Sequence, residues 1–190
     1  MNIISEVEKI VRDTCAQDTN VFTYALTTHF VPVVANAKML ARKLGADLEI
    51  VTLAAWLHDY ASVYDAKLMP EHHLHGPKLA QKILSDLNYP QEKIDRVKHC
   101  IEAHRGSQKI PRETVEAECV ASADAMAQIT EFPALLILAW KVHNLEYQEG
   151  IDFALAKMER SWNKLIPEAR ELVADNYQAI HTVFKNSSTN

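Results

Sequence analysis

LEIVTLAAWLHD, at residues 48–59, is the stretch that decides the fold expected for this chain. Asp47 is a typical helix N-cap, and the residues after it are apolar on nearly every side of a helix. We therefore expect a buried central helix over residues 48–60 that ends in His58 and Asp59. A carboxylate is costly to bury without a partner, and at a helix C-terminus it opposes the helix dipole. The pair therefore indicates a functional role, although a surface cap is the simpler alternative.

Helices are predicted nearly everywhere else in the chain. Apolar residues repeat at helical spacing over residues 3–11 and 22–44, and Pro32 should kink or divide the second of these helices. Proline is tolerated in the first turn, so further helices are expected to open near Pro77, at Pro90 and at Pro111. Their ranges are 76–87, 90–104 and 111–128, followed by 133–147, 151–166 and 167–185. The predicted fold is all-α, a single-domain helical bundle over residues 1–190 with a core at about 22–128 and additional C-terminal helices, 132–185, packed on it.

Composition excludes several classes of protein. The net charge is −5 and Lys/Arg residues form no long run, so nucleic acid is not expected as a main partner. Cys15, Cys100 and Cys119 are scattered and odd in number, which favours reduced thiols in a cytoplasmic protein over a disulfide framework. The longest apolar stretch, residues 132–140, contains a proline and is too short to span a bilayer. The acidic start of the chain does not resemble a signal peptide, so we expect a cytoplasmic location without a membrane partner.

Several residues of the metal-ligand type fall on apolar helix faces. His29 lies within an apolar stripe, His58 and Asp59 end the most apolar helix, His104 follows an apolar stripe by one turn, and Asp124 has apolar neighbours. Each alone has a structural explanation, such as a backbone-bonded core histidine or a buried ion pair. Four helices that point such groups at one interior predict a bound divalent cation. Mixed imidazole and carboxylate ligands suit Mn, Fe, Co, Ni or Zn.

The order of these residues resembles the H…HD…D signature of the HD-domain superfamily of metal-dependent phosphohydrolases. The signature is carried by His29, by LAAWLHD at residues 53–59 and by Ala123-Asp124. EHHLHGPKLA, at residues 71–80, is similar to the HHxxGAxxA element of many members, and CIEAHRGS, at residues 100–107, to the element that supplies a further histidine. The resemblance covers about residues 28–128. It implies an all-α fold, hydrolysis of phosphate esters, often of nucleotides, and a divalent metal ion held by His29, His58, Asp59 and Asp124.

The resemblance also implies a second metal ion, because members with two extra histidines can hold one. By position these are His72 and His104, with His73 as the competitor for the first role. One or two divalent ions per chain (Mn, Fe, Co, Ni, Zn or Mg) are therefore expected. The chain departs from the family pattern twice. No arginine follows His29 in the usual HxxRV spacing. Pro77 replaces the usual alanine after the glycine, a change that is expected to alter the orientation of His72.

The expected activity is hydrolysis of a nucleotide or another small phosphate ester through metal-activated water. Asp59 would coordinate the ion and could bridge two ions, while His104 would be a second-site ligand or a general acid. Arg105 is the candidate phosphate clamp, since its fork matches two oxygens, and Lys67 is a weaker candidate.

Two alternatives remain for the same residues. The first is a di-iron oxygenase of the same fold, and the second is a non-catalytic nucleotide-sensing module in which the metal is a structural clip. The helices after residue 130 are expected to shape the pocket or a dimer interface, so a homo-oligomer stays open. The substrate is expected to be small and phosphorylated.

Overall fold

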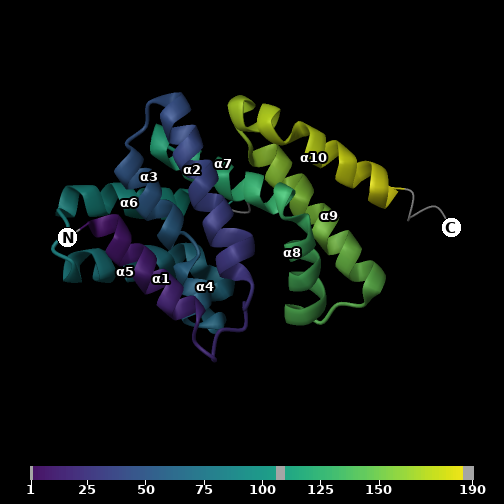
Figure 1. Ribbon diagram of the computed structural model, residues 1–190, viewed down its shortest axis with the longest axis horizontal. Coiled ribbons are helices and arrows are strands. Elements are labelled where there is room, and N and C mark those ends of the chain that lie inside the picture. Colours follow the sequence, from purple (N-terminus) through teal and green to yellow (C-terminus); the bar gives the residue numbers. More distant parts are fainter. Residues whose placement is uncertain (1, 106–109, 186–190) are drawn as a thin grey trace.

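The computed structural model describes residues 2–105 and 110–185, in which the chain is helical and forms no strand (Figure 1). This confirms the predicted all-α fold. Short non-α segments are the 3₁₀ helix η2 (Ala66–Glu71) and two π-helical turns, η1 (Leu26–Phe30) and η3 (Leu138–Val142). The α-helices are α1 (Ile3–Cys15), α2 (Val31–Leu44), α3 (Leu48–Leu57), α4 (Tyr60–Tyr64), α5 (His72–Asp86), α6 (Gln91–Ala103), α7 (Val115–Thr130), α8 (Phe132–Ile137), α9 (Tyr147–Lys164) and α10 (Pro167–Lys185).

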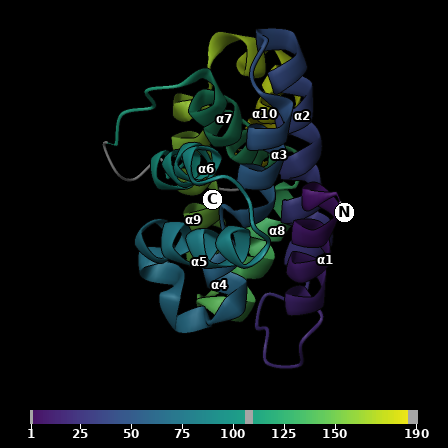
Figure 2. The ribbon, with the colours of Figure 1, turned by 90° about the vertical axis from the view of Figure 1, so that its left-hand side faces the viewer.

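Helix α7 runs through the middle of the molecule, with α1–α6 on one side and α8–α10 on the other (Figure 1). It packs against α2, α3 and α6 on the first side and against α9 and α10 on the second. Viewed from the side, α5 and α6 lie next to each other, and α1 stands beside α3 (Figure 2). Because α7 contacts both groups of helices, a side chain on α7 can meet partners from either side.

Helix α3 is the buried centre that its sequence predicts. The Asp47 side chain accepts hydrogen bonds from the backbone amides of Glu49 and Ile50, and residues 50–57 are all buried. The helix ends at Leu57 rather than near residue 60, because Asp59 leaves helical geometry (φ −111°, ψ 13°) and α4 starts anew after it. The HD pair therefore lies at a break between two helices.

The predicted helix 22–44 is divided near Pro32, as expected, but its first turn starts later. The π turn η1 begins at Leu26, and α2 then begins at Val31 with Pro32 in its first turn, where a missing N–H breaks no helical hydrogen bond. The break places His29 in a π turn rather than in the middle of a long α-helix.

The prediction that a helix opens near Pro77 is wrong. Helix α5 begins at His72, because the 3₁₀ segment η2 leads directly into it, and Pro77 lies inside the helix. Gly76 explains the tight packing there: a Cβ at this position would come within 3.0 Å of the Ile101 side chain on α6. This close approach sets α5, and with it His72, against the centre of the molecule.

Three other boundaries also differ from the predictions. Helix α7 begins after Thr114, whose hydroxyl accepts from the amide of Ala117, so Pro111 precedes the helix instead of opening it. The predicted helix 133–147 ends at residue 142 in a π turn, and the helix expected from residue 151 begins at Tyr147 behind a capping box. At the start of α7, the capping threonine rather than Pro111 therefore sets the boundary.

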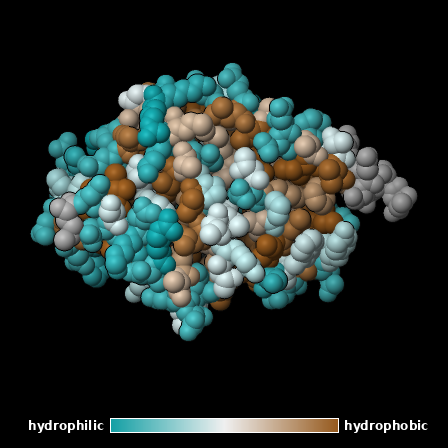
Figure 3. All heavy atoms as spheres, in the orientation of Figure 1, coloured by the Kyte–Doolittle hydropathy of each residue, from teal (hydrophilic) through white to brown (hydrophobic). Residues whose placement is uncertain are grey.

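The surface of one face is uneven in polarity (Figure 3). Hydrophilic residues cover most of the left-hand side, whereas apolar residues gather on the right, over α9 and α10. Leu172 and Val183 on α10 are 46% and 65% exposed. The homo-oligomer expected for the C-terminal helices stays a prediction. All three cysteines are free thiols, with Cys100 and Cys119 buried.

Within residues 2–105 and 110–185, no single helix is both long and apolar enough to cross a membrane. The helices Val115–Thr130 and Phe132–Val142 meet the two criteria only as a pair, and that pair is bent by 82°.

Candidate metal centre

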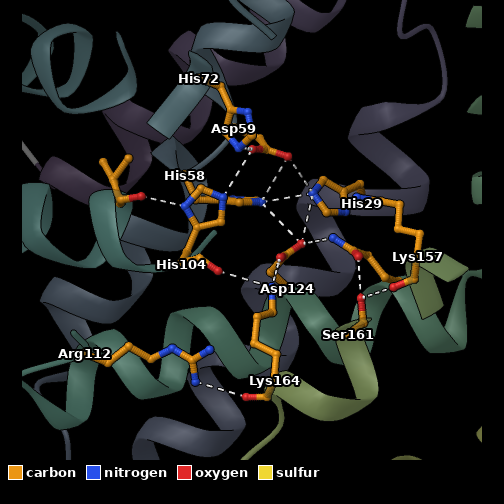
Figure 4. Close-up of polar contacts among 12 residues, drawn as sticks. His29, His58, Asp59, His72, His104, Arg112, Asp124, Lys157, Ser161 and Lys164 are labelled. Atoms are coloured by element: carbon orange, nitrogen blue, oxygen red, sulfur yellow. Dashed lines mark hydrogen bonds and ion pairs between the residues drawn. The ribbon is translucent and has the colours of Figure 1, made fainter. Parts of the chain in front are cut away.

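Six side chains from separate parts of the chain converge beside α7 (Figure 4). All of them were named from the sequence as candidate metal ligands. The π turn η1 supplies one, the α3–α4 break two, the start of α5 one, the residue after α6 one and the middle of α7 one. In that order they are His29, His58, Asp59, His72, His104 and Asp124.

One group of ligand atoms surrounds the His29 ring. Its Nε2 atom lies 3.0 Å from His58 Nε2 and 3.2 Å from Asp59 Oδ2. Asp124 Oδ1 lies 3.7 Å from the same atom and 4.0 Å from His58 Nε2. Four ligand atoms of the kinds that transition metals prefer therefore surround one point.

A second group surrounds the other oxygen of the same carboxylate. Asp59 Oδ1 lies 3.2 Å from His72 Nε2 and 3.5 Å from His104 Nε2. His29, His58 and Asp59 have the spacing of a possible ion site, and so do Asp59, His72 and His104, so Asp59 belongs to both. His73 is not in either group, because its Nδ1 atom contacts the Arg105 guanidinium at 2.7 Å. The geometry thus separates two neighbouring histidines between which the sequence could not choose.

The backbone fixes which ring nitrogens face the centre. In three histidines Nδ1 donates to the carbonyl three residues earlier, over 2.8 Å in His58, 2.7 Å in His72 and 2.6 Å in His104. A neutral ring that donates from Nδ1 presents a lone pair at Nε2. These lone pairs point at the two oxygens of Asp59. Such backbone bonds are the usual outer support of a metal-binding histidine.

Charge in the centre is arranged for a cation. Burial lowers the pKa of His58 to about 4, so this ring is neutral at physiological pH. Burial would raise the pKa of Asp59, but the neighbouring histidines hold it well below its usual value. Burial likewise opposes protonation of His29, yet the hydrogen bond and charge of Asp59 raise its pKa.

Asp59 Oδ1 provides the test of whether these residues fit a metal. It is a buried oxygen without a hydrogen bond among the described residues, and two imidazole lone pairs face it. Buried carboxylate oxygens are almost always paired, and imidazole nitrogens without a proton cannot donate to them. A divalent cation satisfies all three atoms at once. The residues present therefore fit a metal ion.

The fourth ligand, Asp124, is held by helix α9. Lys164 Nζ lies 2.5 Å from Asp124 Oδ2, and it also donates to the carbonyl of His104 at 3.2 Å. Gln128 donates to Asp124 Oδ1 at 2.7 Å and accepts a 2.6 Å hydrogen bond from Ser161. Burial would raise the pKa of Asp124, but Lys164 and the histidines keep it far below its usual value. Sequence reasoning missed Lys164, because nothing distinguishes it from other lysines on amphipathic helices.

A cavity of about 350 Å³ opens beside the centre. Its wall includes Arg105, the residue predicted to clamp a phosphate, while Lys67 does not line it. Arg105 Nη1 contacts the Pro70 carbonyl at 2.6 Å, which ties the guanidinium to η2. The opposite wall comes from η3 and α9 and contributes Lys141, Lys157 and Arg160 among others, which the sequence did not single out.

The comparisons with known proteins agree with this geometry. The family model described as the HD domain matches residues 26–129. Ribonuclease Y of Lawsonia intracellularis is 28% identical over 130 residues, which are 68% of this chain but only 23% of that protein. The chain thus spans less than a quarter of the length of this relative.

Solved structures share the fold. A predicted HD superfamily hydrolase from an uncultured Thermotogales bacterium has a TM-score of 0.62 at 18% identity, covering 96% of this chain and 89% of its own. YpgQ of Bacillus subtilis, solved in complex with ADP, has a TM-score of 0.63 at 21% identity, and 98% of each chain is covered.

Proposed function

This chain belongs to the HD-domain superfamily, and on that premise we propose that it is a metal-dependent phosphohydrolase acting on a nucleotide or another small phosphate ester. The observation that carries the proposal is the position of Asp59, which directs one carboxylate oxygen into each of two histidine groups. A structural clip needs only one closed set of ligands. A carboxylate shared by two sets of ligands, of which the second has only three members, favours a centre that also receives a substrate.

The residues that would hold the ions divide between the two groups. His29, His58 and Asp124 would hold the first ion, His72 and His104 the second, and Asp59 would bridge them. Divalent ions at such a site activate water and offset charge on a phosphoryl oxygen. Of the two roles expected for His104, we favour the ligand role, because its Nε2 faces Asp59 and its Nδ1 is already bonded to the backbone.

The protein's own groups would orient the phosphate. Arg105 lies on the cavity wall, and its bond to the Pro70 carbonyl fixes the direction of its fork. An arginine fork matches two phosphate oxygens. We therefore propose Arg105 as the clamp on the reacting phosphate. His73 Nδ1 also contacts this Arg105 nitrogen, Nη1, at 2.7 Å, which further fixes the position of the guanidinium.

Two observations support a nucleotide as the ligand. The cavity volume of about 350 Å³ lies in the range of small-molecule sites. YpgQ, which shares the fold, was solved in complex with ADP. The ribonuclease match covers a small part of that protein, and the net charge of −5 disfavours a long nucleic acid, so a short oligoribonucleotide is a comparison substrate rather than the main proposal.

The test is elemental analysis followed by a screen of nucleotides, other phosphate esters and an oligoribonucleotide with each divalent ion. We expect bound metal in the wild type and hydrolysis that disappears in Asp59→Ala. Oxygen consumption with a visible iron absorption band and no phosphatase activity would instead identify an oxygenase. Nucleotide binding without turnover under every metal would identify a sensing module.

A further inference from the structure

We propose that η3 and α9 form an anion subsite, centred on Lys157, that binds a second phosphate beyond the one that reacts. The ligands it selects are nucleoside di- or triphosphates rather than monophosphates. This inference rests on the proposed function only where it calls one phosphate the reacting one. The binding of two adjacent phosphates can be measured without hydrolysis.

Lys157 is the central observation. It comes from α9 and extends toward His29 at the edge of the metal centre (Figure 4). In the part of the chain that the structure describes, the Lys157 ammonium makes no ion pair or hydrogen bond, although it lines the cavity. Its charge interacts favourably with Asp124 and Asp59, whose charges ions would largely neutralise, and unfavourably with Lys164 and Arg160. A half-buried ammonium then needs another anion.

The cations around Lys157 share this property. Lys141 on η3 and Arg160 on α9 line the same cavity, and both are exposed. Like Lys157, neither is in an ion pair within residues 2–105 and 110–185, whereas Lys164 is paired with Asp124. Surface lysines elsewhere on this chain commonly have an acidic partner, as the pairs on α1 and α5 show. Elsewhere in the described part of the chain Lys38, Arg42, Lys67 and Lys78 also lack an ion pair, so what distinguishes this wall is that three such cations line one cavity.

The balance of charge in the cavity is opposite to that of the chain. The chain has a net charge of −5, yet the described residues that line the cavity include five Lys/Arg side chains and three Asp/Glu side chains. One or two divalent ions would add further positive charge. A concave site of one sign attracts ligands of the other sign. A monophosphate offers about two negative charges, whereas a di- or triphosphate offers three or four, which suits this excess better.

Backbone geometry independently marks the same wall. The two π turns of the chain's described part, η1 and η3, both line the cavity, and they contribute His29 and Lys141 respectively. In η3 the π turn is closed by a 3.0 Å bond from the amide of His143 to the carbonyl of Leu138. Such turns are rare, and they occur frequently at functional sites. One π turn presents a metal ligand, and the other presents a cation of the proposed subsite.

The position of the wall fits a chain of phosphates. Arg105 lies on the α5–α6 side of the metal centre and Lys157 on the α9 side. A phosphate bound at the ions would thus have one arginine on one side and the Lys157 group on the other. Arg105 would hold the reacting phosphate, and Lys157, Arg160 and Lys141 would hold the next.

The experiment compares AMP with α,β-methylene-ADP, whose bridging carbon resists cleavage, by calorimetry at saturating Mn²⁺. We expect the wild type to bind the diphosphate at least about tenfold more tightly than AMP. Lys157→Met, which keeps the apolar stem, should remove about tenfold or more of the diphosphate affinity while AMP affinity changes by less than about threefold. Lys9→Met is the matched control, because it removes an exposed lysine that pairs with Asp13 on α1.

The subsite is overturned if Lys157→Met weakens AMP and the diphosphate equally, weakens neither, or lowers the metal content in elemental analysis. If Lys157→Met does not fold, Arg160→Met decides, since this side chain is exposed: an unchanged preference for the diphosphate would refute the subsite.

Hydrolysis of monophosphates without any preference for diphosphate binding would leave the proposed function standing and this inference refuted. Lys157-dependent diphosphate binding without hydrolysis of any ester would do the reverse.

Discussion

Replacement of Lys164 by methionine tests whether α9 holds the metal centre together. The Lys164 ammonium lies 2.5 Å from Asp124 Oδ2, and the two side chains are 6% and 5% exposed. Loss of one partner from a buried pair leaves an uncompensated charge and costs about 3–5 kcal/mol, out of a total stability of about 5–15 kcal/mol. At about 2–4 °C per kcal/mol for a chain of this length, metal-free Lys164→Met should melt roughly 6–20 °C below the wild type.

The loss in melting temperature of Lys164→Met should be smaller when metal is bound, because an ion at the centre supplies the positive charge that Asp124 has lost. Scanning calorimetry in chelator and in saturating Mn²⁺ measures both values. Lys9→Met is again the control: its ion pair with Asp13 is 2.6 Å long but 71% and 63% exposed, so its removal should hardly change the melting temperature. Equal losses in the two variants, or a Lys164→Met deficit that metal does not reduce, would refute the reasoning.

Three further predictions concern the centre and the fold around it. Asp59→Ala should lose both ions in elemental analysis, because its two oxygens belong to different ligand groups; retention of a full metal complement would show that it is not the bridge. Arg105→Ala should raise KM for a phosphate substrate by about tenfold with a smaller change in kcat, and an unchanged KM in steady-state kinetics would remove it from the site. Arg96 forms ion pairs with Asp47 and Glu116, each at 3.1 Å. Burial alone would raise the pKa of both carboxyl groups, but hydrogen bonds and the charge of Arg96 lower it. Lowered carboxyl pKa values add stability above the ordinary pKa range and lose it as the pH falls through the folded values. Arg96→Met should therefore cost about 1 kcal/mol at neutral pH in urea unfolding, a difference that shrinks below about pH 4.5; a difference independent of pH would contradict this.

Periodicity in the sequence predicted much of the centre. It placed His29, His104 and Asp124 on buried helix faces, because a polar residue in an apolar stripe can be recognised without knowing the fold. The same reasoning could not choose between His72 and His73. That choice depends on where α5 begins, and η2 moves the start of α5 one turn ahead of the expected proline.

The partners supplied by α9 could not be predicted in this way. Lys164 and Lys157 occupy positions on an amphipathic helix where lysine is common. The significance of Lys164 comes from its contact with Asp124, 40 positions earlier in the sequence, and that of Lys157 from its place in the cavity wall. Hydrophobic patterning shows which face of a helix is buried, but it does not show which distant carboxylate a lysine will meet. The π turns were missed for a related reason, since one extra residue in a turn leaves little trace in the apolar spacing.

The contacts of α9 with Asp124 link the C-terminal part of the chain to the metal centre. The family match ends at residue 129, whereas two groups that support Asp124, Ser161 through Gln128 and Lys164 directly, lie beyond it. The HD-domain part of the chain is thus joined to a C-terminal helix, α9, that both contacts a candidate metal ligand and lines the cavity. Under the proposed function, replacement of α9 by a different helix would change which substrates fit the cavity but not the candidate metal ligands, provided that the new helix supplies its own counter-ion for Asp124.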